Sequence, residues 1–197
     1  MIFRRLLALI SIAIATAAFA ASAGELTLTP ASPQPDETAL RQGLHVVYAY
    51  PQDVKSLASA EHHLGKNQHS AKPLIGFDYP DTEEGDNALT ARQPFQVAAH
   101  ITGFIRFDEA GRYDLEFESN DGLKVEIGGA EVVYYDGRHP CSTPGFVTVV
   151  APEAGWYPLE AIWFQRAGTS CLLMKSGPAG GELDWTPNDA FAFIPKD

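Results

Sequence analysis

The chain has 197 residues, of which 25 are acidic and 14 are basic, and its formal net charge is −11. Two of the basic residues, Arg4 and Arg5, lie near the N-terminus, and the net charge of the chain without them is 12 − 25 = −13. So acidic a surface repels nucleic acid and anionic membranes, and we expect neither as a partner. The length suits one domain with its own core.

Residues 1–23 are predicted to be a secretory signal peptide. Arg4 and Arg5 give it a positive start, residues 6–20 are uncharged, and small residues allow cleavage after Ala20 or Ala23. The alternative is an uncleaved membrane anchor, but these 15 residues (6–20) are fewer than the roughly 20 that span a bilayer. We therefore expect export to the periplasm, the medium or the cell surface, with no membrane insertion after cleavage.

Residues 24–42 form a Pro-rich leader that contains Pro30, Pro33 and Pro35. Repeated prolines interrupt both helix and sheet hydrogen bonding, so this leader is predicted to be a mobile tether. The folded domain is predicted to occupy residues 43–197.

The first half of this domain gives weaker patterns than the second half. Alternating apolar residues predict a strand at 44–48, and residues 53–64 favour a short helix or turn. Residues 65–92 are polar and rich in turn-forming residues, which predicts a long excursion with little regular structure. Residues 95–107 are rich in β-branched and aromatic residues, and Gly103 among them predicts a bulge or bend.

The clearest pattern follows, as two alternating strands joined by an Asn-Asp-Gly turn. Side chains alternate between the two faces of a strand, so this pattern predicts one dry face and one wet face. The positions predicted to face the core are Tyr113, Leu115, Phe117, Leu123, Val125 and Ile127. The positions predicted to face water are Asp114, Glu116, Glu118, Lys124 and Glu126.

Further short strands are predicted through the rest of the chain. They fall at residues 131–135, 146–151, 156–166 and 170–175, and apolar anchors within 185–195 close the domain. Trp156 and Trp163 lie in a dense strand and are predicted to be in the core. Short strands with glycine-containing turns predict an all-β fold, an antiparallel sandwich or barrel.

The chain has two cysteines, Cys141 and Cys171, both in the predicted domain. In an exported protein an even pair suggests a disulfide, here closing a loop of 30 residues (171 − 141). The alternative is two unrelated buried thiols.

Several segments, in this order, resemble the PA14 domain family, and together they extend over about residues 43–195. The matching segments are Phe95–Phe107, Glu109–Tyr113, Ser119–Gly122, Ile127–Gly129 and Ala154–Tyr157. The resemblance implies a β-sandwich or barrel module of adhesins, glycosidases and toxins. Such modules commonly bind carbohydrate or act as spacers, and they are seldom the catalytic centre.

Asn120 and Asp121 have two interpretations. As a hairpin turn, they and Gly122 need no further role, because Asx side chains bond their own backbone and glycine tolerates positive φ. The family resemblance implies a second role, since calcium-dependent sugar-binding members hold the ion with two consecutive aspartates at this point. Here the first of the pair is Asn120, whose amide oxygen can bind calcium but brings no charge. Calcium is thus a candidate cofactor.

A glycan site needs aromatic side chains with polar neighbours, since sugars present both apolar ring faces and hydroxyl groups. The candidates for ligand contact, besides Asn120 and Asp121, are Tyr134, Tyr135, Asp136, Arg138 and Trp185. Adjacent Tyr134 and Tyr135 should point to opposite faces of their strand, so at least one of them is expected to be buried.

Other clusters favour plain surface interpretations. The acidic stretch 78–87 has no EF-hand spacing, and Glu61, His62, His63 and His69 have no zinc-protease spacing. No nucleophile elbow or phosphate loop is present, so we expect no enzyme. The predicted function is an exported carbohydrate-binding module, with a structural or protein-interaction module of the cell envelope as the alternative and a small hydrolase as a third.

Overall fold

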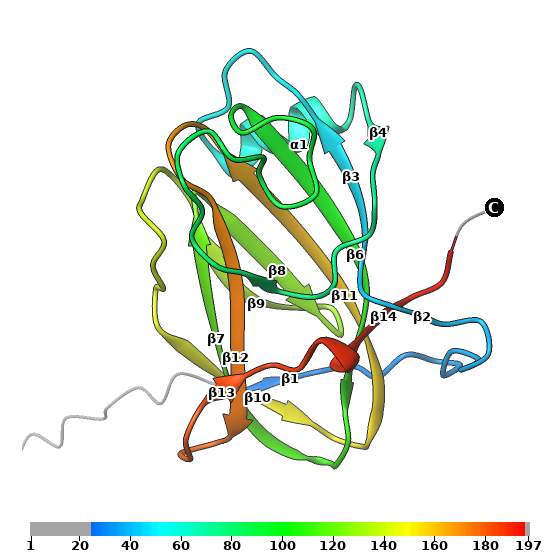
Figure 1. Ribbon diagram of the computed structural model, residues 1–197. Helices are drawn as coiled ribbons and strands as arrows, with labels where there is room; N and C mark the ends of the chain where they lie inside the picture. Colours follow the sequence, from blue (N-terminus) through cyan, green and yellow to red (C-terminus); the bar gives the residue numbers. More distant parts are fainter. Residues whose placement is uncertain (1–24, 196–197) are drawn as a thin grey trace, which may run out of the picture.

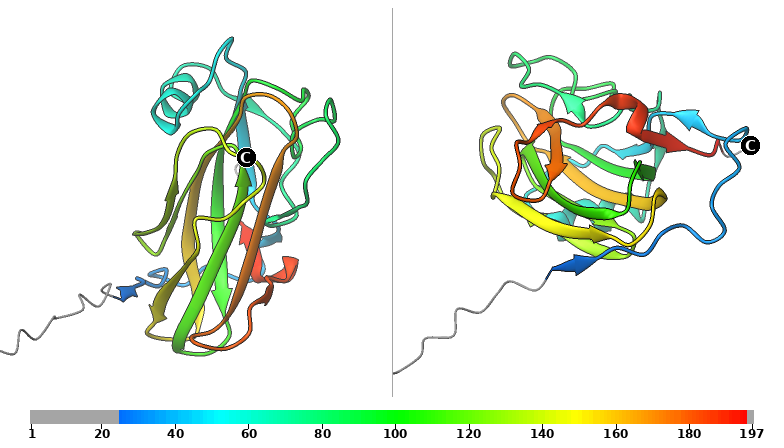
Figure 2. Two further views of the ribbon diagram at one scale, coloured as in Figure 1. Left: turned by 90° about the vertical axis from the view of Figure 1, so that its left-hand side faces the viewer. Right: turned by 90° about the horizontal axis from the view of Figure 1, so that it is seen from below.

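The computed structural model describes residues 25–195, so the predicted signal peptide, 1–23, lies outside the described residues. Two sheets pack face to face as a β-sandwich, which Figure 1 shows from the front and Figure 2 from the side and from below. The predicted all-β sandwich is therefore confirmed. None of the described helices is long and apolar enough to cross a membrane.

Sheet A forms one layer of the sandwich. Its order is β1 (Leu26–Thr27), β10 (Phe146–Ala151), β7 (Gly111–Asn120), β12 (Cys171–Pro178) and β13 (Asp184–Trp185), with β5 (Asp78–Tyr79) beside β12. All of these pairings are antiparallel except that of β1 with β10.

Sheet B forms the other layer. Its order is β2 (Arg41–Gln42), β14 (Phe191–Phe193), β6 (Val97–Phe107), β11 (Gly155–Gln165), β8 (Leu123–Ile127) and β9 (Ala130–Tyr135), with β3 (His45–Ala49) beside β6 and β4 (His69–Ser70) beside β3. The long excursion 65–92 contains only the two-residue strands β4 and β5 as regular structure, in agreement with its polar sequence.

The core lies between the sheets and is filled by the alternating apolar positions. Leu115 and Phe117 of β7 are buried, as are Leu123, Val125 and Ile127 of β8, which confirms the predicted dry face. Trp163 of β11 is fully buried. Each side chain of this kind contributes about 1.5–3 kcal/mol when it is removed from water.

The predicted wet face of β7 is wrong at Asp114, which is buried. The turn after β12 folds back over this position, and the backbone N–H of Gly180 donates to Asp114 Oδ2 at 2.8 Å. The hydroxyl of Thr148 donates to Asp114 Oδ1 at 2.5 Å. These two bonds satisfy the carboxylate inside the protein and lower its pKa.

The Pro-rich leader differs from the predicted tether, because its described part packs against the domain. Leu28 is buried, and its N–H donates to the carbonyl of Val150 at 2.9 Å. The side chain of Gln34 bonds both the N–H and the carbonyl of Trp156, at 2.7 and 3.0 Å. The prolines limit the leader to two short strands, β1 and β2, but side chains and backbone between them still bind the sandwich edge.

Gly103 does not form the predicted bulge, because β6 pairs with β11 without a register shift. On its other edge β6 changes partner at this point, from β3 at Thr102 to β14 at Phe104. A Cβ on Gly103 would lie 2.6 Å from the carbonyl oxygen of Ala192 in β14. The glycine thus permits this close approach, and the bulge falls instead between β8 and β9, at Val125 and Glu126.

The helix α1 (Leu57–Leu64) packs on the outer face of sheet B, against β6 and β11, near the end of the sandwich that is at the top in Figure 1. Ser56 caps it by accepting the N–H of Ser59 at 3.2 Å. A second cap comes from far along the chain, since Asp136 Oδ1 accepts the N–H of Leu57 at 2.8 Å. A 3-10 turn, η1 (Asn188–Ala190), precedes the last strand.

Candidate functional site

Three loops meet at the end of β7, and the pocket between them is the candidate site. The antiparallel pairing of β7 with β12 places Asn120 opposite Cys171, so the turn after β7 lies beside the loop before β12. The loop after β9 closes the third side. These loops enclose an open pocket of about 440 Å³, the loop pocket, lined by Asn120, Asp121, Arg138, His139, Pro140, Ala167, Gly168 and Thr169.

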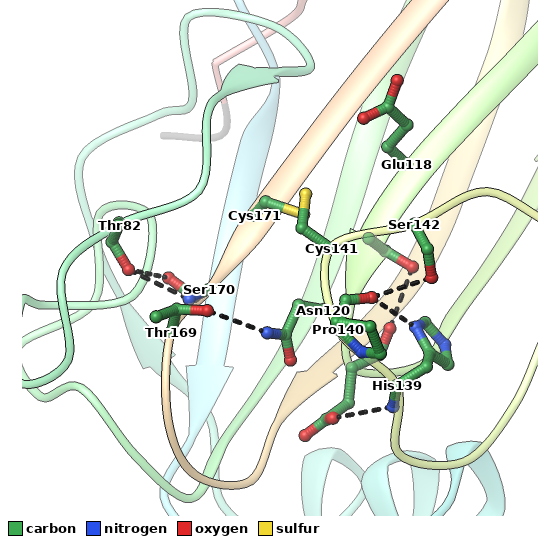
Figure 3. Close-up of a disulfide and its surroundings, with 12 residues drawn as sticks. Thr82, Glu118, Asn120, His139, Pro140, Cys141, Ser142, Thr169, Ser170 and Cys171 are labelled. Carbon is green, nitrogen blue, oxygen red and sulfur yellow. Dashed lines mark hydrogen bonds between the residues drawn. A yellow bond between two sulfur atoms is a disulfide. The ribbon is translucent and has the colours of Figure 1, made fainter.

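A disulfide between Cys141 and Cys171 fixes two of these loops to each other, which confirms the predicted bridge. The Cα atoms are 5.8 Å apart, within the usual range for disulfides. Figure 3 shows the bridge between His139 and Pro140 on one side and Thr169 and Ser170 on the other. Backbone bonds between Ser119 and Ser142, at 3.0 and 3.3 Å, join the same loop to β7.

Asp121 is buried at the base of the loop pocket and joins all three loops. Its Oδ2 accepts the backbone N–H of Arg166 at 2.9 Å, and its Oδ1 accepts that of His139 at 3.3 Å. Burial raises the pKa of this carboxyl, and the two N–H bonds oppose that shift without cancelling it. Asp121 thus positions the pocket walls as well as lining the pocket.

Asn120 is also buried, and the peptide bond between it and Asp121 is cis. Its amide nitrogen donates to the hydroxyl of Thr169 at 3.1 Å. The side-chain nitrogen is therefore bonded to the neighbouring loop, and the side-chain oxygen Oδ1 is the group available to a ligand (Figure 3).

His139 and Arg138 supply the remaining polar wall. The His139 ring stacks on Tyr135, with 3.6 Å between ring centroids and 18° between planes. Among the described atoms its buried Nε2 has no hydrogen-bond partner. Arg138 is exposed at the rim. The wall therefore offers a fixed ring nitrogen and an exposed guanidinium, whose charge interacts with Asp121.

The other predicted ligand residues lie outside this lining. Tyr135 contacts it through His139, and Asp136 caps α1. Tyr134 is 56% exposed on β9, and Trp185 is 56% exposed on β13. Trp185 pairs with Lys175, which itself lies opposite Glu116, four residues before Asn120 on β7. The structure thus brings Asn120, Asp121 and Arg138 together and leaves Tyr134 and Trp185 apart from them.

Sequence reasoning missed Thr169 and the backbone of Arg166 as parts of this site. Both belong to the loop before β12, some 45–50 residues after Asp121 in sequence (166 − 121 = 45). Only the pairing of β7 with β12 brings them together, and no local sequence pattern reports that pairing.

The two side chains alone do not make a complete calcium site. Calcium takes about six to eight oxygen ligands, and its affinity increases with the number of carboxylates. Here both oxygens of Asp121 already accept backbone N–H groups, and Asn120 adds one neutral oxygen. Within residues 25–195, the one cluster with three potential metal ligands is Asp81, Cys141 and Cys171, whose sulfurs are bonded to each other. The calcium interpretation stays a prediction.

Fold and pocket together define a β-sandwich module, with a two-layer scaffold and a loop-built pocket at one end. The sequence profile of the PA14 domain matches residues 43–197, so the chain belongs to the PA14 domain family. No curated protein matches the chain.

Solved structures with the same fold include three informative neighbours. The PA14 domain of the MpAFP antifreeze protein is 15% identical, with a TM-score of 0.64 over 81% of this chain and 93% of that one. A PA14 sugar-binding domain from an RTX adhesin is 17% identical, with a TM-score of 0.61 over 77% and 98%. The epithelial adhesin 9 A domain of Candida glabrata, in complex with Galb1-3GlcNAc, is 14% identical, with a TM-score of 0.64 over 87% and 97%. At these identities the likeness shows the fold.

Proposed function

We propose that this protein is an exported, non-catalytic module that binds carbohydrate in the loop pocket. The observation on which this rests is the convergence of three loops in one pocket: the turn with Asn120 and Asp121, the loop with Arg138, and the loop with Thr169. Two of the solved neighbours support the same role, because one is described as sugar-binding and another holds a disaccharide.

The chemistry of the pocket suits sugar hydroxyl groups. The Asn120 oxygen accepts hydrogen bonds and the Arg138 guanidinium donates them. His139 Nδ1 donates to the carbonyl of Pro140 at 3.2 Å, which leaves its buried Nε2 as an acceptor. The disulfide and the bonds of Asp121 hold these groups in place before the ligand arrives, which reduces the entropy lost on binding.

Catalysis has little support in this pocket. Glycoside hydrolysis generally needs two carboxyl groups, about 5–10 Å apart, whereas the described lining contains one, Asp121. Two other carboxylates, Glu126 and Glu160, lie opposite each other on the outer face of sheet B. Each has a partner on this face: Glu126 lies 3.1 Å from the ammonium of Lys124, and Glu160 lies 2.8 Å from the ring Nε2 of His100. The small hydrolase is thus the weakest alternative.

An extracellular location is part of the proposal. A disulfide persists in oxidising compartments, and the predicted signal peptide would deliver the chain to one. The alternative function, a structural or protein-interaction module of the envelope, is favoured by one observation. Both Asp121 oxygens serve the protein's own backbone, as they would in a purely structural turn.

A glycan array, probed with the wild-type protein and with Arg138→Ala, tests the proposal. We expect wild-type binding to a defined set of glycans and its loss in the variant, whose fold should not change because Arg138 is exposed. Repeating the array with calcium and with chelator tests the cofactor, and unchanged binding in chelator would exclude a calcium requirement. An array without any bound glycan would contradict the proposal and favour the interaction module.

A further inference from the structure

The outer face of sheet A contains a row of side chains that lies apart from the loop pocket. Residues directly opposite each other in paired strands share a face, so the register defines the row. Phe146 of β10 is opposite Glu116 of β7, Glu116 is opposite Lys175 of β12, and Lys175 is opposite Trp185 of β13. We call these four residues the outer row: Phe146, Glu116, Lys175 and Trp185.

The centre of the outer row is a fixed charged group. Lys175 Nζ lies 2.7 Å from a carboxylate oxygen of Glu118 and 3.2 Å from one of Glu116. These side chains are half-buried, so the contacts restrict their motion more than a fully exposed pair would. Two carboxylates share one ammonium, which leaves an excess of hydrogen-bond acceptors on this surface.

The ends of the row are exposed aromatic rings. Phe146 is 62% and Trp185 is 56% exposed, while Trp156 and Trp163 are buried. Lys175 Nζ lies 4.4 Å from the centre of the Trp185 ring and covers one of its two faces. The two rings are three strand spacings apart, about 14 Å.

We propose that the outer row is a second carbohydrate-contact surface, on which a neutral glycan chain lies across the strands of sheet A. Apolar sugar ring faces would pack on Trp185 and Phe146, and hydroxyl groups would donate to Glu116 and Glu118 between them. The separation of the rings fits an oligosaccharide better than a single sugar.

Charge restricts the class of glycan. The chain has a formal net charge of −11, and the central group of Glu116, Glu118 and Lys175 adds one net negative charge at the site. Uronic acid or sulfated chains would therefore be repelled, and a neutral chain would not be. Glu116 lies four residues before Asn120 on β7, about 13 Å away, so this surface can be tested separately from the loop pocket.

Tryptophan fluorescence tests the proposal directly, because Trp185 is the exposed one of three tryptophans. The probes are neutral gluco-, galacto- and manno-oligosaccharides, from disaccharides to hexasaccharides. Acrylamide quenching of the tryptophan fluorescence is measured at increasing concentrations of each probe. We expect at least one series to protect Trp185, to shift the emission to the blue, and to bind more tightly as the chain lengthens. Arg138→Ala should retain this protection, even if loop-pocket binding is lost.

Substitutions supply the controls. Trp185→Ala and Phe146→Ala should each weaken binding of the protecting oligosaccharide about tenfold, which is typical for the loss of an exposed aromatic anchor. Binding by Phe146→Ala can be followed by the Trp185 signal, and binding by Trp185→Ala by calorimetry. Ile194→Ser is the matched control, because Ile194 is 45% exposed beside sheet B and should bind as the wild type does.

Two results would overturn the proposal. One is that no probe changes the quenching of Trp185, although the circular dichroism spectrum shows that the protein is folded. The other is equal binding by wild type and Trp185→Ala. Either result would leave loop-pocket binding, measured through Arg138→Ala, as a separate question.

Discussion

The loop pocket and the outer row lie along the same strand, β7, but they use their polar groups in opposite ways. In the loop pocket, Asp121 gives both carboxylate oxygens to backbone N–H groups of two other loops. In the outer row, Glu116 and Glu118 bond a side chain, Lys175, and stay accessible beside exposed rings. In the loop pocket, a buried carboxylate holds the loops in position. In the outer row, the carboxylates are accessible on strands whose positions backbone pairing already fixes.

This difference predicts that the pocket is sensitive to loop anchoring and that the outer row is not. Variants can therefore separate the two regions, and the expected effects on stability range from several kcal/mol to small changes with pH.

The largest effect is expected from removal of the disulfide in Cys141→Ser/Cys171→Ser. Opening a loop of 30 residues should lower the free energy of unfolding by about 3–4 kcal/mol. Urea unfolding of the variant, and of the wild type with and without reductant, measures this change. Glycan binding in the loop pocket should weaken further than stability alone explains, while Trp185 quenching stays unchanged. Equal weakening at both surfaces would show that the regions are not independent.

Asp121→Ala is expected to cost about 2–3 kcal/mol, because the N–H groups of His139 and Arg166 lose their acceptor. Asp121→Asn keeps one acceptor oxygen in place and should cost less. Hydrogen exchange should become faster at these two amides in the alanine variant. Unchanged exchange there would contradict the positioning role of Asp121.

Asp136→Ala is expected to cost about 1 kcal/mol, since it removes the side-chain cap on the N–H of Leu57 while Ser56 still caps Ser59. Thermal unfolding measures the loss, and glycan binding shows whether Asp136 has a second role. A large loss of binding with little loss of stability would show that Asp136 contacts the ligand, as predicted from the sequence.

The smallest effect is a pair of opposite pH dependences at two buried aspartates. The pKa of Asp114 is lowered by its bonds from Gly180 and Thr148, so its contribution to stability is present above the unfolded pKa and is lost as pH falls through the folded value. The pKa of Asp121 is raised by burial, so its contribution is present at low pH and is lost as pH rises through the folded value.

Urea unfolding between about pH 3 and pH 8 compares wild type with Asp114→Asn and with Asp121→Asn. The advantage of wild type over Asp114→Asn should increase with pH, and its advantage over Asp121→Asn should decrease. Slopes of the same sign would contradict the assigned environments.

Much of the fold follows from local sequence patterns. The alternation of Leu115 and Phe117 with charged residues identifies the inner face of β7, because one face of a sandwich sheet must be dry. Asn120, Asp121 and Arg138 could be chosen as candidates because turn chemistry and side-chain type are also local properties.

The remaining features depend on contacts between distant segments. Asp114 is buried because the turn at Gly180 covers it and donates a hydrogen bond to it. The leader packs against the domain because Gln34 bonds the backbone of Trp156, 122 residues away. Gly103 is needed where β14 pairs closely with β6, a constraint set by the backbone of Ala192, far along the chain. The sequence identifies Trp185 as an aromatic residue, but only the register of four paired strands shows which residues lie beside it in the outer row.

The most direct test of the central claim is an amide chemical-shift map of the protein titrated with the glycan that binds most tightly on the array. Carbohydrate binding in the loop pocket predicts shifts concentrated at the amides of Asp121, His139, Arg166 and Thr169, which Arg138→Ala abolishes. Shifts that leave these amides unchanged, or no shifts with any array glycan, would contradict it.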